Sequence, residues 1–227
     1  MRLNIVLSLH YTKGLVSLLL LMILASANGQ NALSQKQKND SATAEKQKVL
    51  FNFLNISLPD KIADIGTGSG FNLVPIANQY PTLIFTAEDI DSSYCNKELL
   101  QKRINRSGNK TKIENFNIHI GTETTTNLPA NSFTKVLAFD VIHEMTFKSE
   151  MLADIAKILQ HNGMLYIQEI LVHKKIKKEK ACNYPYLTED ELKALLERNK
   201  CRIEREIMFI DTGHNKYIKL FACRFID

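Results

Sequence analysis

The chain has 227 residues, of which 44% are hydrophobic and 23% are charged. These values are ordinary for a globular protein and fit one domain plus an extension. The formal net charge of +5 is small and the basic residues are dispersed, which argues against a nucleic-acid-binding protein. One basic run, Lys174–Lys180, is typical either of a solvated surface or of a segment that attracts anions.

The first 27 residues have the pattern of a secretory signal peptide. Arg2 and Lys13 precede a charge-free apolar stretch, residues 14–25. The small residues Ala25-Ser26-Ala27 stand at the end of this stretch. The apolar stretch is shorter than the roughly 20 residues that span a bilayer. An uncleaved anchor is the alternative. Both alternatives predict an exported protein, periplasmic or secreted, and only a retained segment would contact the membrane.

A polar segment and a short helix precede the expected core. Residues 28–41 are rich in Gln, Asn and Lys, which predicts a flexible linker before a folded domain over residues 42–227. Ser41–Leu54 carries apolar residues at helical spacing and therefore predicts a short amphipathic helix that overlaps the end of this linker.

Strand and helix patterns then alternate. The predicted strands are Lys61–Ile65, Thr82–Glu88, Lys112–Ile120, Phe133–Phe139, Met164–Val172, Cys201–Phe209 and Tyr217–Phe225. The predicted helices are Ser69–Gln79, Ser92–Ile104, Lys148–Leu159 and Glu189–Asn199. Alternation that ends in a hairpin predicts an α/β protein with a doubly wound, mostly parallel, seven-stranded sheet and an antiparallel C-terminal strand.

Three local patterns refine these boundaries. Thr188 followed by Glu191 is a capping box, which fixes the start of the last helix. Pro75 lies inside a predicted helix, where it removes a backbone donor and would kink the helix. Asn162-Gly163 is expected to end the helix before the fifth strand, because Asn reaches the left-handed region most readily after Gly.

The four cysteines are Cys95, Cys182, Cys201 and Cys223. An even number in an exported chain allows disulfides, with three possible connectivities. Cys201 and Cys223 fall on two predicted neighbouring strands, so they form the preferred pair. Buried free thiols are the alternative, and the spacing matches no metal-binding pattern.

The most informative motif covers residues 62–70, Ile-Ala-Asp-Ile-Gly-Thr-Gly-Ser-Gly. An apolar strand ends in Asp64, and glycines alternate at Gly66, Gly68 and Gly70. Glycine lets the backbone approach a ligand closely or adopt a positive φ. A strand, a Gly-rich turn and a helix form a unit that binds nucleoside-bearing cofactors. The third Gly is one residue early for the dinucleotide fingerprint G-x-G-x-x-G.

From Ala63 to about Phe225 the chain resembles the class I S-adenosylmethionine (SAM) dependent methyltransferases of the small-molecule type. Asp64-Ile65-Gly66-Thr67-Gly68-Ser69-Gly70 is similar to motif I of that family. The resemblance implies a Rossmann-like fold, SAM as the cofactor, and methyl transfer to a small-molecule acceptor.

The resemblance also implies the cofactor-binding residues. Asp89, in Glu88-Asp89-Ile90-Asp91-Ser92, would accept hydrogen bonds from a ribose diol, with Asp91 second; an acidic helix cap is the alternative. Thr122 stands where the family has the Asp that binds the adenine amino group, and Thr134 replaces a second acidic residue. The implied set is Asp64, Gly66, Thr67, Gly68, Gly70, Asp89, Ile90, Thr122, Glu123 and Asp140.

The segment after the fourth strand, Asp140-Val141-Ile142-His143-Glu144, resembles the part of the family that faces the cofactor's methionine end and the substrate. Asp140 would hold the SAM amino group, and His143 and Glu144 would supply a general base. In the alternative, His143 only orients the loop. Tyr184-Pro185-Tyr186 would line the substrate mouth or pack within its loop. No metal site is predicted.

Other functions of the same fold remain as hypotheses. The losses at Thr122 and Thr134 favour a protein that binds SAM or another nucleoside, or a scaffold, without transfer. An aminopropyl transferase or a nicotinamide-dependent reductase is the third possibility, and the glycine spacing argues against the reductase. A nucleic-acid methyltransferase is not expected, because no Asn-Pro-Pro-Tyr-like motif follows the fourth strand. The oligomeric state is left open.

Overall fold

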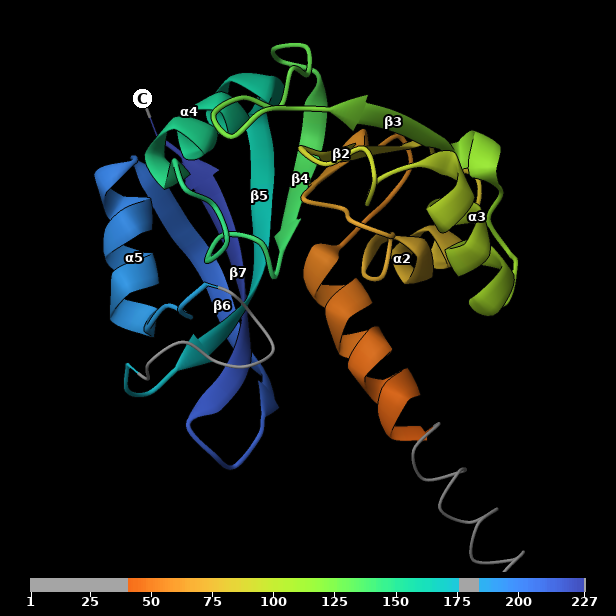
Figure 1. Cartoon of the computed structure of the whole chain (residues 1–227). Coiled ribbons are helices and arrows are strands. Elements are labelled where there is room, and N and C mark those ends of the chain that lie inside the picture. Colours follow the sequence, from red (N-terminus) through yellow and green to blue (C-terminus); the bar gives the residue numbers. More distant parts are fainter. Residues whose placement is uncertain (1–40, 176–183, 227) are drawn as a thin grey trace, which may run out of the picture. The chain divides into compact units, whose positions relative to one another are not determined.

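The computed structural model describes residues 41–175 and 184–226 (Figure 1). The predicted signal peptide, nearly all of the predicted linker and Cys182 therefore lie outside the described residues. The chain divides into two units, residues 1–49 and 50–227. Residues 41–54 are helical, as predicted. None of the helices in the described ranges combines the length and the apolar character that crossing a bilayer requires.

The second unit contains a seven-stranded sheet in the order β3-β2-β1-β4-β5-β7-β6. The strands are β1 (Ile62–Ile65), β2 (Phe85–Asp89), β3 (Phe116–Ile120), β4 (Phe133–Phe139), β5 (Leu159–Val172), β6 (Cys201–Asp211) and β7 (Lys216–Phe225). The first five strands pair in parallel, and β7 is antiparallel to both β5 and β6. The predicted fold class is confirmed.

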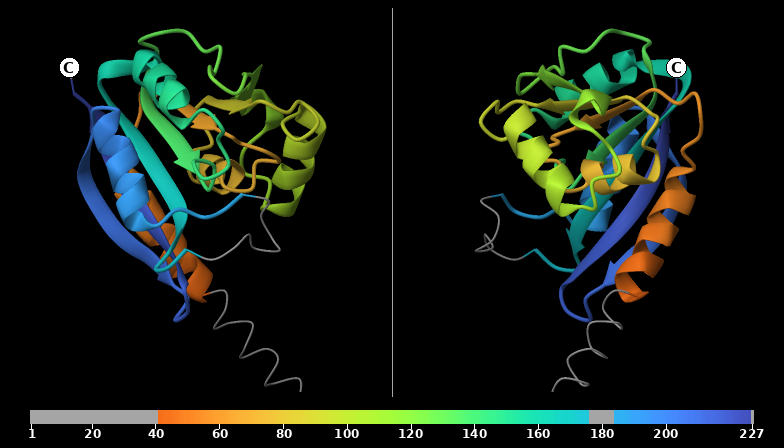
Figure 2. Two further views of the ribbon diagram at one scale, coloured as in Figure 1. Left: turned by 60° about the vertical axis from the view of Figure 1, so that its left-hand side comes forward. Right: turned by 90° about the vertical axis from the view of Figure 1, so that its right-hand side faces the viewer.

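Helices cover both faces of this sheet (Figure 2). They are α2 (Leu73–Gln79), α3 (Lys97–Arg106), α4 (Lys148–Ile158), α5 (Glu189–Arg198) and the short 3-10 helix η1 (Ile113–Asn115). The buried residues of the central strands divide between two separate cores. In β4, Val136 and Ala138 pack with α4 and α5, whereas Leu137 and Phe139 pack with α2 and α3. Burial on both faces explains why the central strands are continuously apolar.

The helix after the glycine motif begins later than predicted. The sequence indicated Ser69–Gln79, but α2 begins at Leu73. Pro75 is therefore in the first helical turn, where the missing backbone N–H costs no intrahelical hydrogen bond. The next helix also begins later, at Lys97, capped by the side chain of Asn96.

Two strand starts also differ from the prediction. β3 begins at Phe116, because residues 113–115 form η1 instead of strand. β5 begins at Leu159, directly after α4, and includes Asn162 and Gly163. Asn162 has no positive φ. The expectation of a left-handed helix end at Asn162 is therefore wrong, since the chain passes straight from α4 into an extended strand.

The predicted capping box at α5 is confirmed. The Glu191 amide donates to Thr188 Oγ1 over 3.3 Å, and the Thr188 amide donates to Glu191 Oε2 over 2.9 Å. We expect Thr188→Ala to lower the free energy of unfolding by about 1 kcal/mol, because it leaves a helix amide without an acceptor. Urea denaturation measures this, with Thr82→Ala as the exposed control outside a helix cap. Equal stability of the two variants would contradict the prediction.

The preferred disulfide is not formed. Cys95, Cys201 and Cys223 are free and buried, so the alternative of buried thiols holds for the described cysteines. Cys201 and Cys223 are nevertheless neighbours on β6 and β7. A hydrogen bond from Cys201, together with burial, raises the pKa of the Cys223 thiol far above its usual range.

Candidate cofactor and active site

The glycine motif forms a tight turn between β1 and α2. Gly66, Gly68 and Gly70 have φ angles of +72°, +53° and +78°. A Cβ on Gly66 would lie 2.3 Å from Val141 Cγ2, so this glycine permits a close approach of two segments. A Cβ on Gly68 would meet no heavy atom within 4 Å, which means that Gly68 borders open space. The turn therefore presents bare backbone to that space, as a ligand cradle requires.

Asp89, at the end of β2, is fixed beside this turn. Its Oδ2 accepts a hydrogen bond from the Gly68 amide over 2.8 Å, and its Oδ1 accepts one from the Asp91 amide over 2.9 Å. Asp91 in turn accepts from the Ser93 amide, in its own local turn. The register that favours Asp89 over Asp91 as the ribose acid agrees with this geometry, because only Asp89 touches the glycine turn.

A cavity of about 360 Å³ opens at this edge of the sheet. Of the predicted site residues, those that line it are Gly66, Gly68, Asp89, Ile90, Thr122, Glu123, Asp140 and Glu144. The other predicted residues, Asp64, Thr67, Gly70 and His143, do not line it. The cavity thus brings together residues from the ends of β1, β2, β3 and β4, where ligands bind in open α/β sheets.

Asp64 and Thr67 lie behind the cavity wall. Both side chains are buried, and Thr67 Oγ1 donates to the backbone oxygen of Asp64 over 2.8 Å. Burial, with the nearby charge of Asp89, raises the pKa of the Asp64 carboxyl to about 7. Asp64 and Thr67 therefore stabilise the glycine turn from the buried side, away from the cavity.

The two threonines that replace acidic residues have local partners. Thr122 Oγ1 accepts from the Thr124 and Thr125 amides, which ties its hydroxyl into its own turn. Thr134 Oγ1 accepts from the Lys61 amide and donates to Asp60 Oδ1, at the start of β4 away from the cavity. The replacement of an acidic residue by Thr134 therefore lies outside the candidate site, whereas the replacement by Thr122 changes a residue of the cavity wall.

Asp140 follows β4 with a φ of +56°, in the left-handed region. Gln168 Nε2 donates to its Oδ2 over 2.8 Å, while Oδ1 is buried and has no partner among the described residues. Burial and the charge of Glu169 raise the pKa of the Asp140 carboxyl to about 6. Oδ1 is therefore an acceptor that lies just beneath the surface of the site, near the side chain of Asn72.

His143 is buried and pairs with a carboxylate that the sequence analysis did not identify. Its Nδ1 lies 2.5 Å from Glu169 Oε1, and its Nε2 lies 3.7 Å from Glu144 Oε1. Burial alone would lower the pKa of His143, but the hydrogen bond and charge of Glu169 outweigh it and raise the pKa. Glu169, His143 and Glu144 thus form a row of three neighbouring groups. Glu144 is half-exposed and lines the cavity, whereas Glu169 is buried.

The segment after β5 contributes one aromatic residue to the cavity. Tyr184 lines it, while the Tyr186 ring is buried against His143, with ring centroids 4.9 Å apart. The basic run Lys174–Lys180 lies mostly outside the described residues. Lys175, at its start, forms an ion pair of 2.9 Å with Glu191.

Sequence reasoning missed Glu88 as a cavity residue. It is only 1% exposed, and burial followed by the charge of Asp89 raises the pKa of its carboxyl to about 8. Strand alternation gives a signal for this residue, since it places a carboxylate on the buried face of β2. Other missed lining residues are Ile65, Tyr94, Val141, Met145, Thr146 and Met151, whereas Asp91, the second candidate for the ribose acid, also lines the cavity.

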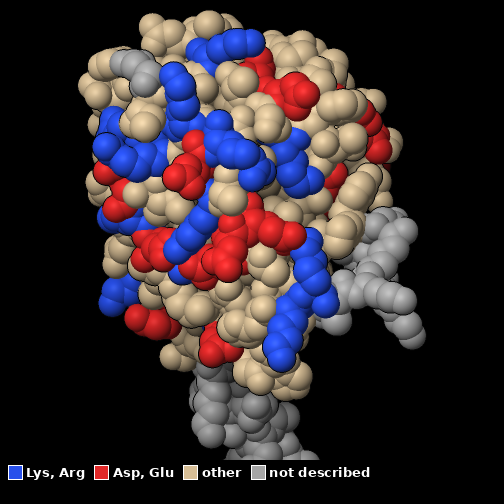
Figure 3. Space-filling view, turned by 90° about the vertical axis from the view of Figure 1, so that its left-hand side faces the viewer, with Lys and Arg blue, Asp and Glu red and all other residues tan. Residues whose placement is uncertain are grey.

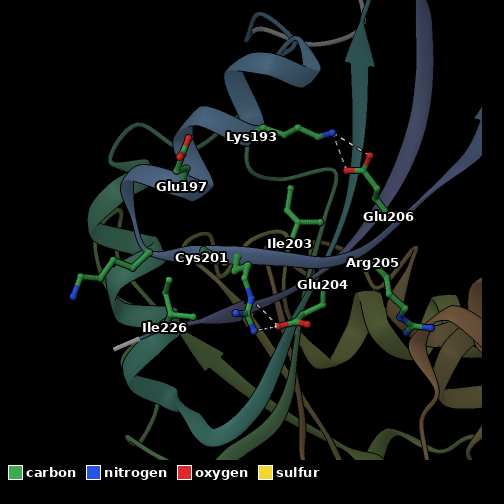
Figure 4. A pocket seen from close by; sticks show the side chains of 10 residues that line it. Lys193, Glu197, Cys201, Ile203, Glu204, Arg205, Glu206 and Ile226 are labelled. Carbon is green, nitrogen blue, oxygen red and sulfur yellow. Dashed lines mark hydrogen bonds and ion pairs between the residues drawn. The ribbon is translucent and has the colours of Figure 1, made fainter.

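A second, larger hollow of about 660 Å³ lies between α5 and β6 (Figure 4). Its charged side chains pair with one another: Lys193 with Glu206 over 3.0 Å, and Arg202 with Glu204 over 2.6 Å. On this side of the molecule, acidic and basic residues are interspersed (Figure 3). No residue of the glycine motif lines this hollow, so the smaller cavity is the candidate site.

Among the described residues, no group of three or more His, Cys, Asp or Glu is arranged to hold a metal ion. The carboxylates of the cavity accept hydrogen bonds, so they suit an organic ligand that carries several hydrogen-bond donors. Asp89 beside the glycine turn and the unpaired Oδ1 of Asp140 would hold a ribose diol and an amino group, the donors that SAM offers.

Comparisons with known proteins agree with this site. Residues 63–165 match the model of a family described as a methyltransferase domain. A SAM-dependent methyltransferase from Aquifex aeolicus is 17% identical, with 78% of this chain and 88% of that chain covered and a TM-score of 0.61. No curated protein sequence matches the chain.

Two further solved structures show how widely the fold is used. Geranyl diphosphate C-methyltransferase from Streptomyces coelicolor, in complex with Mg²⁺, geranyl diphosphate and S-adenosylhomocysteine, is 10% identical, with 81% and 79% of the two chains covered and a TM-score of 0.62. The [4+2]-cyclase SpnF is also 10% identical, with 79% and 80% covered and a TM-score of 0.63.

Proposed function

We propose that the protein is a class I, SAM-dependent methyltransferase that methylates a small-molecule acceptor outside the cytoplasm, since residues 63–165 match a family described as a methyltransferase domain. The observation that most directly supports SAM as the cofactor is the position of Asp89. Both of its oxygens are held by amides, one of them in the open glycine turn, so that the carboxylate is fixed at the cavity wall. Such a fixed carboxylate suits the two hydroxyls of a ribose.

The charge of the cavity supports a cationic ligand. Besides Glu88, whose raised pKa of about 8 keeps its carboxyl mostly protonated near neutral pH, the lining includes Asp89, Asp91, Glu123, Asp140 and Glu144, and the described lining contains no Lys or Arg. When bound, SAM supplies a methyl group on a positively charged sulfur. Carboxylates gathered in a cleft attract such a cation and raise its local concentration.

Glu144 is placed to receive a proton from the acceptor. It lies in the cavity wall, with His143 Nε2 3.7 Å behind it and Glu169 fixing the other ring nitrogen. A proton on Glu144 can be stabilised by a His143 ring held by Glu169, and a raised pKa suits His143 to proton transfer near neutral pH. In this proposal Glu144 is the base, and His143 and Glu169 are positioning residues.

The acceptor class and the location are further parts of the proposal. A cavity of about 360 Å³ is within the size range of small-molecule sites. A methyltransferase with a similar fold is solved with geranyl diphosphate, a small molecule. Export is supported by the residue pattern of the first 27 residues. Detection of the protein in an extracytoplasmic fraction, with N-terminal sequencing, would test that pattern.

A binding protein without transfer is the second candidate. The structural similarity to a [4+2]-cyclase supports it, because the same fold serves a protein of another activity. Release of S-adenosylhomocysteine from SAM in the presence of candidate acceptors separates the two candidates. A protein that binds SAM but never releases this product with a broad acceptor panel would favour the second.

Calorimetric titration of SAM and S-adenosylhomocysteine into the full chain tests the cofactor site. We expect Asp89→Ala to lower the affinity at least about 100-fold, because two hydrogen bonds to a charged acceptor are lost. Asp89→Asn keeps one acceptor for the Gly68 amide and should bind with intermediate affinity.

Asp91→Ala is the matched control, since Asp91 is exposed and makes its contacts within its own turn. It should retain most of the affinity. Circular dichroism confirms that each variant is folded. Wild-type protein that binds neither ligand would overturn the cofactor assignment, and loss of binding in Asp91→Ala alone would assign the ribose to Asp91.

A further inference from the structure

Glu88 is a buried carboxyl that the fold itself leaves incompletely satisfied. Phe85 and Ala87 of β2 pack against α2 and α3, so the alternation of the strand turns Glu88 to the opposite face. It is 1% exposed there and lines the candidate site. A buried carboxyl of this kind needs partners on both oxygens to offset its lost hydration.

Only one oxygen of Glu88 has a partner. The Gly66 amide donates to the carboxyl, whereas Oε1 is buried without a hydrogen-bond partner in the described ranges. Oε1 is left as a buried acceptor in a residue that lines the cavity, next to Gly121 in the segment that follows β3.

The backbone around Glu88 leaves space for this arrangement. A Cβ on Gly121 would lie 2.0 Å from Oε1, so the absence of a side chain at Gly121 is what admits the carboxyl. Asp64, Asp89 and Asp154 surround Glu88 with like charge, and no described cation compensates it. The missing partner is therefore a hydrogen-bond donor supplied by a ligand.

The place of Glu88 identifies which part of the cofactor faces it. Asp89, next in the strand, is held at the glycine turn on the β1 side. Glu88 Oε1 lies toward Gly121, at the end of β3, where Thr122 and Glu123 also line the cavity. A nucleoside with its ribose at Asp89 and its amino-acid end at Asp140 directs its base toward β3. The hydroxyl of Thr122 is engaged in its own turn there.

We propose that Glu88 Oε1 accepts a hydrogen bond from the exocyclic amino group of the cofactor's adenine. Glu88 thus takes the recognition role that Thr122 leaves open, from a different strand. The inference rests on SAM being the cofactor and adds to it a residue that selects adenine over other bases.

Two ligands that differ only in the base test this role. S-Adenosylhomocysteine carries the amino group, and S-inosylhomocysteine carries a carbonyl oxygen in its place. Calorimetric titration of both into the full chain is done at pH 9, above the raised pKa of Glu88, so that the carboxyl is ionised and only accepts. Wild-type protein should bind the adenosyl ligand at least about tenfold more tightly, because two acceptors repel in the inosyl complex.

Glu88→Gln should reverse this preference. A Gln side chain that keeps its oxygen toward the Gly66 amide places its NH₂ group where Oε1 was. That group donates to the carbonyl of the inosyl ligand and repels the adenine amino group. The ratio of the two affinities is expected to shift at least about 100-fold between wild type and variant, tenfold from each ligand.

Asp89→Ala separates this inference from the cofactor assignment. It should weaken both ligands by the same factor and leave their ratio unchanged, because the ribose is common to them. Glu114→Gln, an exposed acid between β2 and β3, is the neutral control. Absence of adenosyl binding in wild type would overturn the cofactor assignment. Binding without discrimination in wild type, or an unchanged ratio in folded Glu88→Gln, would overturn the role of Glu88 alone.

Discussion

Gly66→Ala is expected to lower the free energy of unfolding by about 3 kcal/mol and to weaken SAM binding. The native φ of +72° costs an L-residue about 1–2 kcal/mol. The new Cβ would also lie 2.3 Å from Val141 Cγ2 and 2.9 Å from Val141 Cβ, and such overpacking typically costs about 1–3 kcal/mol. Val141 lines the cavity, so its displacement changes the site directly.

Gly213→Ala is the matched control for this prediction. Gly213 has a φ of +69°, but a Cβ there would meet no atom within 4 Å. Its substitution should therefore cost only the conformational part, about 1 kcal/mol, and leave SAM affinity unchanged. Urea denaturation and calorimetry measure both variants. Equal destabilisation of the two variants would show that the clash between the new Cβ at position 66 and Val141 costs no free energy.

The stability of the ligand-free protein is expected to fall by about 3 kcal/mol between pH 6 and pH 8. Burial raises the pKa of Asp64 to about 7 and that of Glu88 to about 8, from their usual values of 3.8 and 4.5. Within this window the folded state binds more protons than the unfolded state, so stability falls as pH rises. His143 acts in the same direction, since its raised pKa favours the protonated folded form at the low end.

Groups with lowered pKa values do not oppose this trend. Burial would raise the pKa of Glu189, but its hydrogen bonds to lysine and tyrosine outweigh this and lower the pKa to about 2. Glu189 is therefore fully ionised in both the folded and the unfolded state above pH 6, so its contribution to stability is constant in this window. Urea denaturation at pH 6, 7 and 8 at constant ionic strength tests the prediction. Glu88→Gln should flatten the slope to about half, while Glu114→Gln should keep it. Stability that rises with pH would contradict the assignment of buried acids.

The sequence predicts the architecture well because each part of it has a local cause. Continuous apolar runs form the buried parallel strands, and Thr188 with Glu191 fixes the start of α5. The glycine spacing alone locates the cavity, since positive φ angles at Gly66 and Gly68 follow from residue type. Boundaries fail where tertiary structure decides, as at Asn162, which lies within β5 although its residue type predicts a helix end there.

The site is predicted less completely because two of its carboxylates act across strands. Glu169 is 26 residues after His143, and only the pairing of β4 with β5 brings the two together. Glu88 reads as the end of a buried strand, and its open oxygen is apparent only once the segment from Gly121 is folded over it. The contact between His143 and Glu169 has no signal in residue spacing, and the alternation of β2 gives the face on which Glu88 lies but not its open oxygen.

Gln168 and Glu169 are adjacent in β5 but face opposite sides of the sheet. Gln168 fixes Asp140, and Glu169 fixes His143. Substitution of Gln168 therefore removes a hydrogen bond to Asp140 alone, whereas substitution of Glu169 alters both His143 and Asp140, because the charge of Glu169 raises the pKa of Asp140. During evolution the two positions are thus unequal, and a change at Glu169 affects the cofactor end and the acceptor end of the site at once. Insertion of a single residue in β5 would exchange the two side chains and break both hydrogen bonds together.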